Sequence, residues 1–392
     1  MLPSYVNHAR DVPLNFDFPD ELKQLRETAR ALLTARAPAT AARKVLQGEL
    51  DFDRDLWKEI GALGWLAATI PEPYGGINLG PLAVCVLAEE IGRSLASVPF
   101  SSSVMIATEA LLHYGSSEQR RAHLPRLADG SAIGTLAFIE RLGAVDPRSW
   151  STHFTRGRLE GTKIVVADGA VADIAIVAAR TPDGAPGLYI AELAGATVTR
   201  TSCETIEPSR GHANLCFEGH PAEPLPGAHG TAFSSLLDRA AVMMAFEQIG
   251  VAAAALDMAT AYAKERYAFG RPIGSFQAIK HKLVDVYVAL ELARSNAYFA
   301  AWALAQDARE LPVAAAAARV AASEAAWLAT KENIQTHGGM GFTWDIDCHL
   351  FYRRAKLLGL ALGSATEWKR KLITRLSAQE DGASSQTTSR GA

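Results

Sequence analysis

The sequence predicts a mainly helical protein with a central β domain, and three observations support this prediction. Before about residue 130, apolar residues recur at three- and four-residue spacing, as in DELKQLRETARALL, which is typical of amphipathic helices. Short β-rich runs separated by turn residues follow, up to the proline- and glycine-rich segment PAEPLPGAHG. Long alanine-rich helical stretches fill the rest of the chain and suit a helical bundle.

These three zones predict the domain organisation. We expect an N-terminal helical domain over 1–130, a central β domain over 131–226, a C-terminal four-helix domain over 227–378 and a disordered tail over 379–392. The last domain's helices are expected near 231–268, 275–307, 312–337 and 347–377. The runs GTLAFIE, KIVVAD, IAIVAAR and GLYIAEL predict a small antiparallel barrel or sandwich. No GxGxxG follows any of them, which argues against a Rossmann dinucleotide site.

The composition of the 392 residues argues against several classes of protein. A formal net charge of -3 does not suit a nucleic-acid-binding surface. The four cysteines are scattered without CxxC spacing, which is typical of reduced thiols and favours a cytoplasmic location. No charge-free run is long enough for a membrane span, and the N-terminus lacks the apolar core of a signal peptide. We therefore expect neither feature.

Glu247 is the first candidate for chemistry. It stands in AAVMMAFEQIGVAAAAL, where the apolar run from Ala240 to Leu256 is otherwise interrupted only by Gln248. A carboxylate on the apolar face of a helix loses hydration, which favours its neutral form and suits it to accept a proton from a weak carbon acid. The alternative is that Glu247 pairs with an arginine from a neighbouring helix and has a structural role.

The segment KERYAFGRPIGSFQAIKH contains a helix end beside two arginines. Gly270 permits a turn after Phe269, and a proline two residues later prevents the helix from continuing. Arg266 and Arg271 lie beside this break, where planar guanidinium groups suit a pair of phosphates. Gln277 adds an amide that both donates and accepts hydrogen bonds. The alternative is a capped helix corner without a ligand.

The segment QTHGGMGFTWD, residues Gln335–Asp345, is a glycine-rich loop after a long helical stretch. Its glycines expose backbone amides and let a ligand approach, although such a loop is commonly only a tight turn. His337, His349, Asp345 and Asp347 match no metal-ligand spacing, so no metal is expected. The basic stretches FYRRAK and WKRKLITR predict solvated helix faces, and contact with a phosphate is the alternative.

Together these parts resemble the acyl-CoA dehydrogenase family over about residues 14–376. LGWLAATIPEPYGG is similar to the family's N-terminal signature, ERYAFGRPIGSFQ to its helix-turn FAD segment and QTHGGMGF to its second FAD segment. The resemblance implies a helical, a β and a four-helix domain, with FAD held between domains and between subunits of a tetramer. It also implies an electron-transferring flavoprotein as the acceptor that reoxidises the flavin.

The resemblance also assigns cofactor contacts. Arg266 is similar to the arginine that reaches the FAD pyrophosphate of a neighbouring subunit, and the same segment supplies further contacts through Phe269, Gly270 and Gln277. The residues that match the second segment, along the adenosine end of FAD, are Gln335, His337, Gly338 and Gly339. Ser364 falls where family members place a small hydroxyl residue near the cofactor.

The catalytic base departs from the family pattern. Many members carry a glutamate before a Gly-Thr pair in the last domain, where this chain has Leu362; others place it on the first helix of that domain, where this chain has Ala240. Glu247 lies two turns further along the same helix face, which fits a larger acyl group, and Asp238 is a second candidate. The family's Thr-Glu-Pro near the start of the β domain is replaced by AFIERLGAVDP, with Glu140 as the only match.

The implied reaction is the FAD-dependent α,β-dehydrogenation of an acyl-CoA thioester. A base, here Glu247, removes the α-proton while hydride passes from the β-carbon to the flavin. EQxG and HGGxGFTW are similar to a bacterial branch that acts on bulky CoA thioesters, including steroid side-chain acids. Several of its members are heterotetramers in which one chain supplies the base. A homotetramer, a non-catalytic partner subunit, and a flavin oxidase or monooxygenase on the same scaffold remain alternatives.

Overall fold

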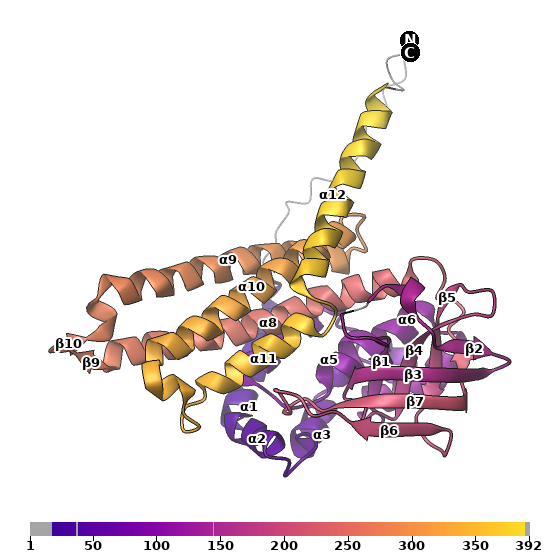
Figure 1. The fold of residues 1–392 in the computed structure, drawn as a ribbon, viewed down its shortest axis with the longest axis horizontal. Coiled ribbons are helices and arrows are strands. Elements are labelled where there is room, and N and C mark those ends of the chain that lie inside the picture. The colour runs from indigo at the N-terminus through magenta and orange to yellow at the C-terminus, as the bar shows by residue number, and fades with distance from the viewer. Residues whose placement is uncertain (1–17, 37, 144, 389–392) are drawn as a thin grey trace.

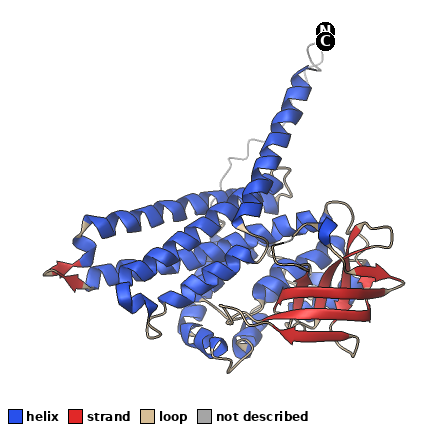
Figure 2. Ribbon diagram, viewed as in Figure 1, coloured by secondary structure: helices blue, strands red, loops and turns tan. Residues whose placement is uncertain are grey.

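The computed structural model describes residues 18–36, 38–143 and 145–388. Figures 1 and 2 show the N-terminal helices packed beside one β-sheet, with long C-terminal helices running away from the sheet. The predicted order of a helical region, a β region and a second helical region is confirmed. The domain limits inferred from composition stay predictions.

The N-terminal region is a set of short helices around one buried helix, α4. Its helices are α1 (Asp20–Ala35), α2 (Pro38–Leu46), α3 (Arg54–Ala62), η1 (Trp65–Ala67), η2 (Glu72–Tyr74), α4 (Pro81–Ser94), α5 (Phe100–Ser102), η3 (Ser103–Thr108), α6 (Glu109–Tyr114) and α7 (Ser117–Ala128). Residues 83–92 of α4 are all buried, because this helix packs on the C-terminal helix α8 (Ala232–Glu265). The α4–α8 contact therefore joins the first and last parts of the chain.

Two glycines let α4 and α8 cross with their backbones in contact. A Cβ atom built on Gly92 would lie 2.0 Å from the Glu247 carbonyl oxygen, and one built on Gly250 would lie 1.9 Å from the Glu89 carbonyl oxygen. No larger residue fits at either position unless the helices separate. This close approach places the α4 end directly beside the turn of α8 that carries Glu247.

The β region is one eight-stranded sheet in the order β6-β7-β3-β2-β4-β5-β8, with β1 beside β4. Its strands are β1 (Gly134–Ala137), β2 (His153–Thr155), β3 (Arg158–Ala167), β4 (Ile174–Arg180), β5 (Pro186–Glu192), β6 (Val198–Ser202), β7 (His212–Pro221) and β8 (Glu223–Pro224), with η4 (Pro147–Ser149) before β2. The expectation of a wholly antiparallel sheet is wrong in one respect, since β4 pairs with β1 and β2 in parallel. Parallel pairing requires a long connection between the two strands. The alternation of residues within a strand does not show which strands such connections bring together.

A buried ion pair lies inside the β region. Lys163 Nζ is fully buried and lies 2.6 Å from Glu140 Oε1, and the Glu140 carboxylate also accepts hydrogen bonds from Ser151 and from the Thr152 backbone. Burial opposes ionisation of Glu140, but the bonds from Lys163 and Ser151 lower its pKa to about 2. Burial lowers the pKa of Lys163 to about 8. Glu140, the match to the family's Thr-Glu-Pro motif, thus has a structural role here.

Within its described residues, the C-terminal region contains five α-helices where four helices were expected. They are α8, α9 (Gln277–Ala305), α10 (Leu311–His337), α11 (Cys348–Leu360) and α12 (Ala365–Thr388), with the hairpin β9 (Tyr267–Ala268) and β10 (Arg271–Pro272) and the short helices η5 (Ile273–Ser275) and η6 (Gly338–Phe342). The expected helix over 347–377 is interrupted at 361–364, where Gly363 has a φ of +100°. That conformation suits glycine and breaks the helix.

The last helix corrects a second expectation. Helix α12 continues to Thr388, so residues 379–388, expected to form part of a disordered tail, are helical, while 389–392 lie outside the described residues. Adding residues to an existing helix costs less free energy than nucleating a new helix, so the polar residues 379–388 can continue α12. Helix α8 is long and apolar enough to cross a membrane, but 78% of its most apolar window is buried, so it is a core helix.

Candidate functional site

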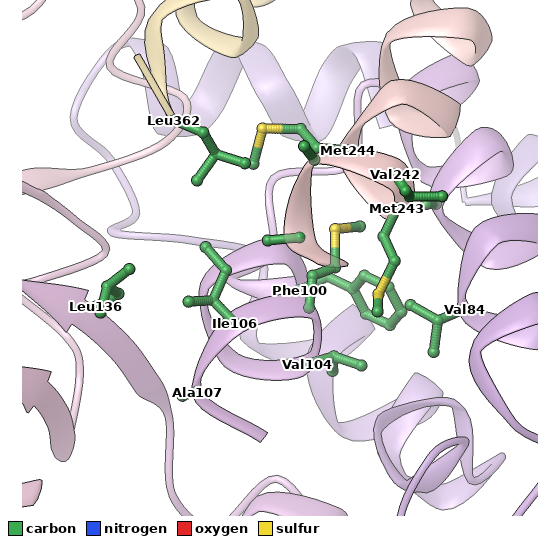
Figure 3. Close-up of a cluster of buried hydrophobic side chains, with 14 of the residues drawn as sticks. Val84, Phe100, Val104, Ile106, Ala107, Leu136, Val242, Met243, Met244 and Leu362 are labelled. Atoms are coloured by element: carbon green, nitrogen blue, oxygen red, sulfur yellow. The ribbon is translucent and has the colours of Figure 1, made fainter. Parts of the chain in front are cut away.

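The first cavity lies where the three regions meet and has a volume of about 230 Å³. Its walls come from the α5–η3 segment, strands β1 and β3, the loop between β6 and β7, Met244 of α8 and residues 356–362 at the end of α11. Figure 3 shows four of its apolar side chains, Ile106, Leu136, Met244 and Leu362, converging from four different elements. We call this space the inner cavity.

The second cavity is larger, about 470 Å³, and is lined by charged side chains. It lies between the β region and the C-terminal helices, and its charged residues are Asp146, Arg148, Glu367, Arg370 and Lys371. Burial lowers the pKa of Lys371 against the attraction of Asp238. The expectation of a solvated face over WKRKLITR is confirmed at Arg370, which is exposed, but it is wrong at Trp368, which is buried, and Lys371 is half-buried. We call this space the outer cavity.

Leu362 lines both cavities and marks the point where they adjoin. It stands in the interruption between α11 and α12, which a capping box fixes. Ser364 Oγ accepts a hydrogen bond from the Glu367 backbone amide at 3.3 Å, and Glu367 Oε2 accepts one from the Ser364 amide at 2.7 Å. The Ser-x-x-Glu spacing was visible in the sequence and is a signature of a helix start.

Replacing Ser364 with alanine is expected to lower the free energy of unfolding by about 1 kcal/mol, because the cap of α12 is lost. Chemical denaturation followed by circular dichroism would measure this change. Ser377→Ala, at an exposed position inside α12, is the control and should change stability little. An unchanged stability together with loss of bound FAD would contradict the capping role and support the predicted cofactor contact.

Glu247 is fully buried and lies among arginines. Its Oε1 is 3.7 Å from Nη1 of Arg210 and 3.7 Å from Nη1 of Arg354, and neither carboxylate oxygen accepts a hydrogen bond from the described residues. It does not line the inner cavity, whose nearest contribution from the same helix is Met244, one turn earlier. The arginine pairing that the sequence left as the alternative is thus present, and the role of Glu247 as a base stays a prediction.

The two arginines beside Glu247 are tied into the surrounding structure. Arg210 donates hydrogen bonds to Asp168 and to Ser101 Oγ, both at 2.8 Å. Arg354 contacts Glu207 Oε1 at 3.2 Å and Ser209 Oγ at 3.0 Å. Arg354 is fully buried, so the expectation of a solvated face over FYRRAK is wrong at this position. It shares the α11 face of buried Phe351, Ala355 and Leu358, a spacing that could have revealed it.

Asp238, the second base candidate, also lies beside a cation. Its Oδ2 accepts a hydrogen bond from Arg375 of α12 at 2.8 Å, while its Oδ1 has no partner among the described residues. Burial raises the pKa of Asp238 to about 6, and Arg375 opposes that rise. Asp238 lines neither cavity.

The first predicted FAD segment forms an exposed hairpin at the end of α8. Phe269 is 95% exposed, and it and Gly270 form the turn between β9 and β10 with φ values of +53° and +76°. Arg266 follows the last residue of α8 and is exposed, and Gln277 is an exposed residue that begins α9. Neither Arg266 nor Arg271 makes an ion pair within the part of the chain that the structure describes.

The second predicted FAD segment lies next to the first. His337 ends α10 and stacks on Tyr262 of α8, one turn before Arg266, with ring centroids 4.0 Å apart. Gln335, Gly338 and Gly339 are exposed beside it. Both segments thus gather at one end of the helical bundle, whereas Glu247 and both cavities lie toward the sheet. The 19 residues from Glu247 to Arg266 span about 28 Å along α8.

Sequence reasoning missed the residues that the fold brings to the cavities. Glu207 lines the inner cavity, and Arg148 lines the outer one, yet neither stands in a motif. Arg148 lies in the three-residue helix η4 and Glu207 in the loop between β6 and β7, and segments this short carry no periodicity that predicts which side chains face inward. Ser364 was singled out as a cofactor contact, and the structure gives its hydroxyl a capping role.

The chain matches two family models and many known proteins. Residues 19–131 match the acyl-CoA dehydrogenase N-terminal domain, and residues 229–377 match the acyl-CoA dehydrogenase C-terminal domain. The acyl-CoA dehydrogenase IpdE2 of Mycolicibacterium smegmatis is 34% identical over 359 residues, which cover 90% of this chain and 98% of that protein. The mitochondrial short-chain specific acyl-CoA dehydrogenase of Rattus norvegicus is 31% identical, with 89% and 88% covered.

Two solved structures superimpose closely on this chain. The Tcur3481-Tcur3483 steroid ACAD has a TM-score of 0.85 and 32% identity, covering 92% of this chain and 99% of that chain. A chain of the ChsE4-ChsE5 complex from Mycobacterium tuberculosis has a TM-score of 0.85 and 28% identity, covering 93% and 99%. Members of the family that these proteins share bind FAD. On sequence, domain order and fold, this chain belongs to the acyl-CoA dehydrogenase family of flavoprotein oxidoreductases.

Proposed function

We propose that this chain is a subunit of an enzyme that dehydrogenates a bulky acyl-CoA thioester between its α- and β-carbons, with FAD as the hydride acceptor. The observation that supports this most strongly is the pair of cavities that adjoin at Leu362. A mostly apolar cavity beside a charged one suits a ligand with an apolar acyl group and a phosphate-bearing carrier. The relative named as a steroid ACAD favours a ring-bearing acyl group.

In this proposal the outer cavity binds the CoA moiety. Arg148, Arg370 and Lys371 provide positive charge from two different regions of the chain, and guanidinium groups suit phosphate oxygens. The inner cavity then receives the acyl group, so that the thioester lies near Leu362. Apolar walls from four elements exclude water there, which strengthens any polarisation of the thioester carbonyl.

The FAD contacts are proposed at the far end of the bundle. Arg266 and Arg271 are exposed arginines without an acidic partner in the described ranges, which fits a pyrophosphate. These arginines belong to a cluster of proposed FAD contacts that is remote from both cavities. The other members of the cluster are Phe269, Gly270, Gln277, Gln335, His337, Gly338 and Gly339. When bound, FAD supplies the hydride acceptor. Because the cluster is remote, we propose that it serves the cofactor of a neighbouring subunit in a homotetramer or heterotetramer.

Exposed apolar residues support an oligomer. Val284, Val288 and Leu292 follow one another at four-residue spacing on α9, and each is about half exposed or more. Such a stripe is typical of a surface that another helix covers. We also propose an electron-transferring flavoprotein as the acceptor and a cytoplasmic location, which the four free cysteines fit.

Glu247 is the proposed base of this chain. Its two oxygens accept no hydrogen bond from the described residues, so a proton acceptor is available one helical turn beyond the inner cavity. The contacts of its Oε1 with Arg210 and Arg354 favour a second candidate function. In that case the chain is a non-catalytic partner, and a related chain supplies the base.

Anaerobic flavin bleaching by an acyl-CoA separates the two functions. The protein, purified with any chain that accompanies it, is titrated with straight-chain, alicyclic and steroid-derived CoA thioesters. Glu247→Gln should abolish bleaching while FAD stays bound, and Glu247→Asp, which keeps the charge but withdraws the carboxylate, should slow it strongly. Normal bleaching in folded Glu247→Asp and Glu247→Gln proteins would show that Glu247 is structural and that the base is Asp238 or comes from a partner chain. A chain that is yellow and active alone excludes the partner role.

A further inference from the structure

The end of α11 forms one wall of the inner cavity. The residues of this helix end and of the break after it that line the cavity are Leu357, Leu358, Leu360, Ala361 and Leu362. The last four carbonyl oxygens of an α-helix have no partner within the regular helix. The position of this wall therefore depends on the groups that bond to those carbonyl oxygens.

One of these carbonyl oxygens is bonded by a side chain from another helix. The Gly363 amide donates to the Leu360 carbonyl oxygen at 3.0 Å, which is a local bond within the break. The Leu358 carbonyl oxygen instead accepts a hydrogen bond from Nη2 of Arg319, which stands in the middle of α10. Arg319 thus ties the cavity wall to the neighbouring helix of the bundle.

Arg319 is itself fixed in place and is 1% exposed. Its Nη1 donates to Gln248 Oε1 of α8 at 2.6 Å, and Gln248 Nε2 donates to Ser323 Oγ at 3.0 Å. Burial lowers the pKa of Arg319 to about 10, although the charge of Glu247 opposes this change. Burying a charged group is costly, whereas a helix end is commonly capped by glycine without that cost. A buried arginine at this place fits a wall whose position is important.

We propose that Arg319 is a positioning residue for the acyl group of the substrate, because its bond to the Leu358 carbonyl oxygen holds the end of α11 in the place that the acyl group requires. This inference rests on the proposed binding of the acyl group in the inner cavity. The planar guanidinium group bonds to Gln248 and Leu358 at the same time, and an ammonium group on a flexible stem does not reproduce that geometry. A misplacement of about 1 Å near reacting groups can cost about 100-fold in rate.

The two cavities distinguish this role from a purely structural one. Five residues between 357 and 362 line the inner cavity, whereas Leu362 alone among them lines the outer cavity. A displaced α11 end should therefore weaken the binding of an acyl-CoA and leave the binding of free CoA almost unchanged. A general loss of structure should weaken the binding of both ligands.

Calorimetry with two ligands tests the proposal. The probes are cyclohexanecarboxyl-CoA and free CoA, added to the FAD-containing protein purified with any chain that accompanies it. Arg319→Lys is expected to weaken binding of the thioester about 10- to 100-fold and to change binding of free CoA by less than about two-fold. Gln248→Met removes the group that orients Arg319 and should act in the same direction. Arg309→Lys makes the same exchange at an exposed position before α10, so it is the matched control and should change neither affinity.

The outcomes separate this inference from the proposed function. Unchanged thioester binding in folded Arg319→Lys overturns the positioning role and leaves acyl-CoA binding intact. Equal weakening of both ligands, together with a lower midpoint of thermal unfolding, also overturns it, because Arg319 would then only stabilise the fold. Absence of thioester binding to the parent protein overturns the proposed function and this inference with it. If Arg319→Lys does not fold, Gln248→Met decides the question by the same comparison.

Discussion

Replacing Glu247 with alanine is expected to lower the free energy of unfolding by about 3–5 kcal/mol. The buried arginines Arg210, Arg354 and Arg319 would then face only the carboxylates of Asp168 and Glu207, which leaves one buried positive charge in excess. Glu247 Oε1 lies 3.7 Å from both Arg210 and Arg354, and all three side chains are almost completely buried. These arginines come from the β6–β7 loop and from α11, so the cluster joins the β region to the helical bundle. Chemical denaturation with unchanged m-values would measure the loss.

The control for this prediction is Glu265→Ala, an exposed glutamate at the end of the same helix. It should change stability by less than about 0.5 kcal/mol. A similarly small change for Glu247→Ala would mean that Arg210 and Arg354 are satisfied without it. The free energy of unfolding and the rate of flavin bleaching are independent measurements. Loss of a catalytic base lowers the rate of bleaching without unfolding the protein, whereas loss of a structural ion pair lowers stability without changing the reaction itself.

Replacing Gly250 with valine is expected to prevent α4 and α8 from packing and to abolish folding or to cost at least about 3 kcal/mol. The Cβ atom alone would lie 1.9 Å from the Glu89 carbonyl oxygen and 2.7 Å from the Arg93 amide nitrogen. Both obstacles are backbone atoms of a buried helix, so no side-chain rotation relieves the overlap. Yield of folded protein and the midpoint of thermal unfolding are the measurements.

Gly359→Ala is the matched control for Gly250→Val. Gly359 also lies inside a helix, α11, but a Cβ atom there meets nothing within 4 Å. Alanine is a better helix former than glycine, so this variant should be as stable as the parent or up to about 1 kcal/mol more stable. If Gly250→Val folds with normal stability, the α4–α8 crossing is not as close as the structure has it.

Local sequence patterns predicted most of the helices and strands because each depends on neighbouring residues. Helical periodicity identified α8, α9 and α10 to within a few residues, and the β-rich runs identified β1, β3, β4 and β5. The interruption at 361–364 was missed because the apolar pattern continues across it. Ser364 and Glu367 carried the missing signal, a capping box, in the middle of an otherwise helical segment.

The candidate site was predictable only in part. Glu247 stands out in the sequence because a charge in an apolar helix is unusual, and its arginine partner was foreseen as an alternative. The identity of that partner was not, because Arg354 lies more than a hundred residues away in a stretch that reads as a basic surface. Glu207 and Thr205 had no local signal at all, since loop residues face a cavity only after the sheet and bundle have docked.

The sequence by itself determined the family and the order of helical and β regions, because these properties reside in short stretches of neighbouring residues. Only the tertiary structure decided that Glu247 is enclosed by arginines, that Leu362 divides two cavities and that Glu207 retains an unpaired oxygen. Burial and charge pairing are properties of packed surfaces from distant parts of the chain, so no local pattern encodes them.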